Sequence, residues 1–110
     1  MDLNLVVICG QLAAEPEHRI IDAASSMLRL LVTVRSDIPH RRIDLIPVMK
    51  WDPSPDLLDG RLAVGKRVWV TGWLQRSFGD GPHPGDHSSR LEILAHDVDT
   101  KELEDDHGPI

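Results

Sequence analysis

The chain has 110 residues, of which 41% are hydrophobic, and a formal charge of −6 at pH 7. A chain of this length forms one compact domain with one core. The longest apolar run, Leu3 to Cys9, is interrupted by Asn4 and is much shorter than the roughly 20 residues that span a bilayer. The N-terminus lacks the basic and apolar regions of a signal peptide, so we expect a soluble, cytoplasmic protein with no membrane partner.

The negative charge is concentrated at the end of the chain. From Met1 to Leu91 eleven basic residues balance eleven acidic ones, whereas the remaining segment holds seven acidic residues and only Lys101. The chain is therefore better described as a neutral body with an acidic tail, and its net charge does not exclude a polyanionic partner. We expect a folded domain over residues 1–98 and an acidic, disordered tail over residues 99–110.

The first half of the chain alternates apolar and polar residues with the period of β-strands. Leu3 to Leu12 is predicted to be the first strand, with a bulge or tight bend at Gly10. A second strand is predicted from Met27 to Arg35 and a third from Ile43 to Trp51. Between the first two, Arg19 to Asp22 is expected to be a short extended segment.

The second half continues with one helix and two strands. Asp56 to Ala63 spaces its leucines as a short helix does, although Gly60 disfavours one. Arg67 to Leu74 alternates valines with tryptophans and is predicted to be the fourth strand, and Arg90 to Val98 the fifth. The stretch from Phe78 to Ser89 is rich in glycine, proline and histidine, so we expect a mobile hairpin loop there.

Five strands with one short helix between the third and fourth predict an all-β fold, the Greek-key barrel of the OB fold, whose sheet face and loops bind oligonucleotides or oligosaccharides. We find no phosphate-binding glycine loop, nucleophile elbow or paired carboxylates, so we expect no enzymatic activity and no cofactor. His83 and His87 lie near Asp80 and Asp86 in sequence, but the spacing matches no zinc motif and we expect no metal.

Five short stretches along these elements have a specific order and spacing: Asn4 to Leu12, Glu15 to Arg19, Val48 to Trp51, Leu62 to Gln75, and Leu91 to Ala95. Together they resemble bacterial single-stranded DNA-binding proteins, which have the OB fold. The resemblance implies that the chain binds single-stranded DNA in replication, recombination or repair, associates with the nucleoid, and forms a homo-oligomer, a tetramer or a dimer. It also implies that the acidic tail recruits replication or repair proteins.

Members of that family stack bases on aromatic rings along a basic groove. The resemblance and the strand faces together predict phosphate contacts from Arg29, Arg35, Arg42 and Arg76, and base contacts from Trp51, Trp73 and Phe78. Structural alternatives remain for these residues. The arginines would simply be solvated, Trp51 would anchor the core beneath the helix, and Trp69 with Trp73 would pack a subunit interface.

The aromatic set is sparse, with three tryptophans, one phenylalanine and no tyrosine. Leu45 and Gly79 stand about where the family has stacking tryptophans. A second hypothesis therefore stays open, a divergent OB-fold protein that serves oligomerisation or interaction and binds nucleic acid weakly or not at all.

Overall fold

The computed structural model describes residues 1–80 and 87–100, with side chains given for residues 1–77 and 89–100. Within these ranges the chain forms β1 (Val6–Leu12), β2 (Glu17–Asp22), β3 (Ser25–Ser36), β4 (Arg42–Trp51), α1 (Pro55–Leu58), β5 (Arg67–Asp80) and β6 (His87–Asp99). The predicted all-β class is confirmed. No helix in the described ranges is long and apolar enough to cross a membrane.

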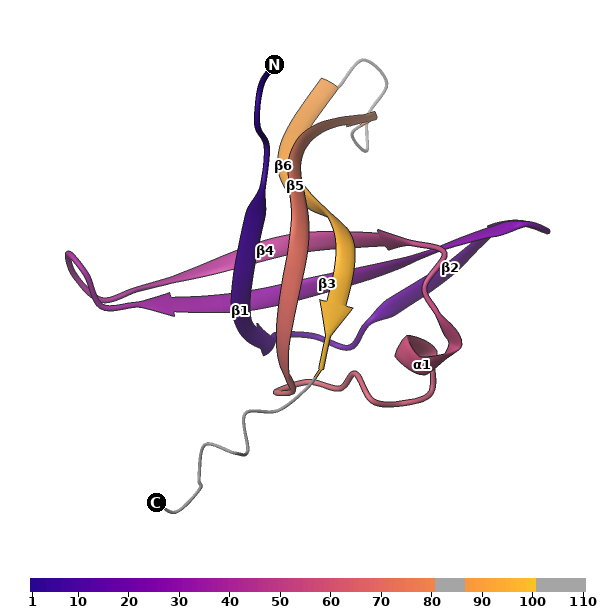
Figure 1. The fold of residues 1–110 in the computed structure, drawn as a ribbon, viewed down its shortest axis with the longest axis horizontal. Helices are drawn as coiled ribbons and strands as arrows, with labels where there is room; N and C mark the ends of the chain where they lie inside the picture. Colours follow the sequence, from indigo (N-terminus) through magenta and orange to yellow (C-terminus); the bar gives the residue numbers. More distant parts are fainter. Residues whose placement is uncertain (81–86, 101–110) are drawn as a thin grey trace.

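The strands form one sheet in the order β1-β5-β6-β4-β3-β2, and a further pairing of β1 with β3 closes five of them into a barrel. Only β4 and β6 pair in parallel among the described strands; the other pairings are antiparallel. In Figure 1 the long β3–β4 hairpin crosses β1, β5 and β6. This is the OB-fold barrel that the sequence predicted, with β2 added outside it along β3.

The core is built from alternate residues of the barrel strands, as the period-two pattern predicted for β3 and for the first half of β5. Fully burying one aliphatic side chain stabilises the folded state by roughly 1.5 to 3 kcal/mol. The core cluster consists of Leu12, Leu28, Leu30, Val32, Val48, Leu62, Val68, Val70, Ile93, Ala95 and Val98. Because these residues point inward, their sequence neighbours on the same strands point outward.

Gly10 lies where β1 approaches β3 and the barrel closes. β1 pairs with β5 from Val6 to Gln11, and its last two residues also pair with β3. A Cβ atom at Gly10 would lie 2.2 Å from the Thr33 carbonyl oxygen and 2.9 Å from Cγ1 of Val32. The close approach of the two backbones therefore requires glycine. The β1–β5 register continues through Gly10 without a shift, so the bulge expected there is not found.

Two predicted boundaries are wrong because of local interactions. β1 begins at Val6 rather than Leu3, since the Asn4 side chain takes the place of a backbone pair. Its Nδ2 donates to the Leu74 carbonyl at 2.8 Å, and the Leu74 amide donates to its Oδ1 at 2.9 Å. The helix is limited to Pro55–Leu58, because Gly60 adopts a φ of 94°, outside the helical region.

Two other segments are more ordered than the sequence indicated. The extended segment expected from Arg19 to Asp22 belongs to a full strand, β2. The predicted loop from Phe78 to Ser89 is partly paired, because β5 and β6 continue as a long hairpin in which Phe78 is opposite Ser89. The rest of that loop, residues 81–86, and the end of the tail, residues 101–110, lie outside the described residues.

We expect Gly10→Ala to destabilise the protein by about 3 kcal/mol or more, because the added methyl group collides with backbone that cannot move without opening the barrel. Urea unfolding followed by tryptophan fluorescence measures this. Gln11→Ala is the matched control. Gln11 already has a Cβ atom, and shortening its side chain leaves the backbone pairing of β1 with β3 intact. Equal stability of the two variants would contradict this account of closure.

Candidate functional site

The outer side of the β3–β4 hairpin forms a continuous face of basic and apolar side chains. Residues directly opposite in paired strands share a face, and the register pairs Arg29 with Met49 and Arg35 with Ile43. Leu30 and Val48 alternate with them and lie in the core, so this face looks outward. We call it the β3–β4 face; it comprises Arg29, Leu31, Thr33 and Arg35 of β3 with Ile43, Leu45, Pro47, Met49 and Trp51 of β4. Met49 is the buried member of this face, with 9% exposure.

Arg29 and Arg35 present unpaired positive charge on this face. Within the described part of the chain, neither guanidinium takes part in a hydrogen bond or an ion pair. Arg42 is different, because its Nη2 lies 3.0 Å from Oδ1 of Asp44 and its charge is partly neutralised there. Of the predicted arginines on this hairpin, Arg29 and Arg35 are therefore the ones most available to an anion.

The apolar part of the face is mainly aliphatic. Leu45 is 58% exposed, and Ile43 and Pro47 flank it along β4. Trp51 at the end of β4 is 42% exposed, which argues against the alternative in which it anchors the core. A planar ligand on this face would thus meet one indole and several aliphatic side chains.

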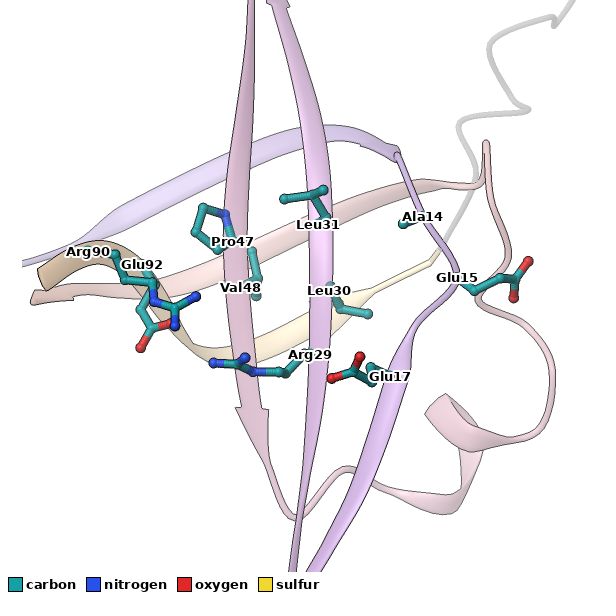
Figure 2. A pocket seen from close by; sticks show the side chains of 10 residues that line it. All are labelled: Ala14, Glu15, Glu17, Arg29, Leu30, Leu31, Pro47, Val48, Arg90 and Glu92. Carbon is teal, nitrogen blue, oxygen red and sulfur yellow. The ribbon is translucent and has the colours of Figure 1, made fainter. Parts of the chain in front are cut away.

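Two hollows open along the face. The central pocket has a volume of about 210 Å³ and holds Arg29, Arg90 and Glu92 at one end. Figure 2 shows these three side chains extending toward one another. The residues that line this pocket are Ala14, Glu15, Glu17, Arg29, Leu30, Leu31, Pro47, Val48, Arg90 and Glu92. The hairpin pocket, about 390 Å³, is lined by Arg35, Ser36, Asp37, Arg41, Arg42 and Ile43. Both hollows place an unpaired arginine beside apolar surface.

The predicted residues of β5 are not part of this face. Trp73 is opposite Leu94 of β6 and reaches the face only across that strand. Arg76 lies on the other side of β5, because it is three residues from Trp73 in an alternating strand, and its Nη1 donates to Ser89 Oγ at 3.1 Å. From their alternating strands we expected Arg29, Arg35 and Arg76 to share the polar faces of neighbouring strands; the structure instead separates Arg76 from the other two. Phe78 belongs to β5, but its side chain lies outside what the structure describes.

Glu92 is a buried carboxylate that sequence reasoning missed. It is 2% exposed, whereas Leu91, which alternates in step with the buried Ile93, is 51% exposed. The upper part of the β5–β6 hairpin extends past the barrel core, so the apolar alternation no longer indicates the buried side. Oε1 of Glu92 accepts a hydrogen bond from Ser77 Oγ and a weaker one, at 3.4 Å, from Gln75 Nε2. The sequence signal for a buried polar group here was the pair of polar residues Gln75 and Ser77 on β5, which the register places opposite Glu92 and Arg90.

Comparison with known proteins gives a consistent result. The model of the family described as "Single-strand binding protein family" matches residues 3–101. Among solved structures, one titled "Plasmodium falciparum SSB complex with ssDNA" has a TM-score of 0.79 and 19% sequence identity, covering 93% of this chain and 97% of that one. At this identity the structural likeness establishes the shared fold. No curated protein sequence matches the chain.

We expect Ser77→Ala to lower the free energy of unfolding by about 1 to 3 kcal/mol, because the buried Glu92 carboxylate loses its stronger donor. Ser89→Ala is the control, since it removes a hydrogen bond from an exposed serine of the same hairpin. Thermal or urea unfolding measures both. If Ser77→Ala lowers the free energy of unfolding no more than Ser89→Ala does, the hydrogen bond to Glu92 contributes little to stability.

Proposed function

The chain belongs to the single-strand binding protein family, and we propose that its β3–β4 face holds single-stranded DNA. Family membership makes it a DNA-binding protein and not an enzyme. The observation that carries the proposal is the presence of unpaired arginines and exposed apolar side chains on one outward sheet face. Single strands are bound by cations that contact phosphates and by apolar platforms under the bases, and OB folds commonly use this face.

Arg29 and Arg35 would contact different phosphates. They are six residues apart on β3, which corresponds to about 20 Å at roughly 3.3 Å per residue. A strand bound along the hairpin would thus pass from the central pocket to the hairpin pocket, where Arg42 offers a further contact at the price of its ion pair with Asp44. A longer strand would continue over the β5–β6 hairpin, which carries Trp73, Arg76 and Phe78.

Bases would stack on Trp51 and pack against Leu45 and Ile43. Each base–aromatic stack contributes about 1 to 3 kcal/mol in proteins of this kind. Aliphatic side chains provide apolar area without the geometry of ring stacking. We therefore expect this chain to depend more on its arginines, and hence on salt, than a groove lined with aromatic rings.

We also propose that a second copy of the chain covers the opposite side of the barrel, giving a dimer or a tetramer. Leu5 and Val7 on the N-terminal segment and Trp69 on β5 expose apolar surface on one side of the molecule. In the described structure, the edge of β1 from Val6 to Gly10 that faces away from β5 pairs with no strand. Unpaired strand edges and contiguous apolar patches favour association.

The acidic end of the chain supports a third proposal, the recruitment of replication or repair proteins in the cytoplasm, at the nucleoid. Residues 101–110 lie outside the described residues, and Glu104, Asp105 and Asp106 give that segment its charge. A run of like charge is typical of interaction tails.

Arg29→Ala and Arg35→Ala should each weaken binding to an oligo-dT strand and reduce the slope of log affinity against log salt by about 0.7, the value expected for one lost phosphate contact on a single strand. Fluorescence anisotropy at several salt concentrations measures this. Arg61→Ala is the matched control, because Arg61 is paired with Asp59 near α1 and lies off the face. Binding that does not respond to salt, or an equal effect of Arg61→Ala, would count against the proposed surface.

Replacing Val7 or Trp69 by arginine should convert the oligomer to monomers, because a charge would be buried at the interface. Light scattering coupled to size-exclusion chromatography gives the mass directly. Leu58→Arg is the control, since Leu58 is an exposed leucine of α1 on another part of the surface. An unchanged mass for the Val7 and Trp69 variants would place the interface elsewhere.

A further inference from the structure

Glu92 is an acidic group inside a surface that we assign to a polyanion, and it needs an explanation. It lines the central pocket together with Arg29, Leu31, Pro47 and Arg90. Burying a charge is costly unless it is paired. Yet neither arginine forms an ion pair with it in the described structure, although Figure 2 shows both extending toward it. Both arginines therefore remain available to phosphates.

The hydrogen bonds of Glu92 leave one of its oxygens available. Ser77 and Gln75 both donate to Oε1. No donor to Oε2 is found among the described residues. No buried side-chain oxygen or nitrogen in those residues is without a partner, so Oε2 is not sealed in the interior. An ionised carboxylate only accepts hydrogen bonds. Because Glu92 lines the central pocket, its carboxylate offers a fixed acceptor there.

We propose that Glu92 reads bases in the bound strand and makes this chain prefer cytosine, adenine and guanine over thymine. The inference rests on the proposed function of the β3–β4 face. With phosphates on Arg29 and Arg90, the base edges are the hydrogen-bond donors that the strand can offer to Glu92. Cytosine N4, adenine N6 and guanine N2 each carry an amino group that can donate to a carboxylate. Thymine has no amino group, and its one ring donor, N3–H, lies between the carbonyl oxygens at positions 2 and 4, which repel a carboxylate that approaches it.

The size of the pocket agrees with a contact to a single base. Its volume of about 210 Å³ lies below the roughly 300 to 1,000 Å³ of sites that enclose a whole small-molecule ligand. Leu31 and Pro47 supply apolar walls for the faces of a base, and Glu92 supplies a buried acceptor at the end that also holds Arg29 and Arg90. The alternative is that Glu92 merely repels phosphates, which would weaken binding to every sequence by the same factor.

Competition anisotropy with oligo-dC and oligo-dT of equal length, at one salt concentration, tests the proposal. The wild-type protein should bind dC about tenfold more tightly than dT, the effect of one charge-assisted hydrogen bond. Glu92→Gln should bring this ratio close to one, because the amide offers both a donor and an acceptor and can pair with either base. Glu17→Gln is the matched control: it removes a negative charge from the same pocket at an exposed residue paired with Arg19, so it should tighten binding to both strands and leave the ratio unchanged.

A second comparison needs only the wild-type protein and remains informative if Glu92→Gln does not fold. Oligonucleotides of 5-methylcytosine and of thymine carry the same methyl group, but only the 5-methylcytosine strand carries an amino group. The protein should therefore still bind the 5-methylcytosine strand about tenfold more tightly than the thymine strand. Equal binding of these two strands, or equal tightening of dC and dT by Glu92→Gln, would overturn the proposal. Failure of the wild-type protein to bind any of these strands would instead overturn the proposed function of the face, together with the inference that rests on it.

Discussion

The contact between β1 and β3 at Gly10 is the constraint on which the rest of the structure depends. It closes the sheet into a barrel, and closure decides which side of every strand is interior. Once Leu30 and Val48 are enclosed, their neighbours on β3 and β4 must face outward. The candidate binding surface is therefore a direct consequence of closure, because the same alternation that fills the core arranges the arginines and aliphatic residues of the β3–β4 face.

The surface differs from an aromatic-lined groove in its chemistry. Leu45 and Ile43 give apolar contact without strong base stacking, while Arg29 and Arg35 give charge that no partner in the described structure neutralises. This balance favours contacts with the phosphate backbone, which carry no sequence information. Glu92 is the exception, since a buried acceptor held by two hydrogen bonds gives the pocket a directional group. Under the proposed function, this surface therefore has one position capable of discriminating between bases.

Local sequence patterns were sufficient to identify the buried side of strands that have the core on one side and water on the other. β3 has core on one side and water on the other, so its leucines and valines identified the buried side correctly. The pattern failed on the β5–β6 hairpin beyond the barrel, where Leu91 is exposed and Glu92 buried. It also failed at the start of β1 and at the C-terminal end of the predicted helix, where a side-chain amide and a glycine conformation, respectively, decide the boundary.

The sequence by itself determined the all-β class, the succession of strands along the chain and the inward face of β3. These follow from period-two alternation and turn chemistry, which act over a few residues. Only the tertiary structure decided which arginines share a surface. Arg29 and Arg76 have similar sequence settings, yet β6 and β4 separate their strands and they lie on opposite sides of the sheet. Strand order and the burial of Glu92 arise from contacts between segments distant in sequence, which local periodicity does not encode.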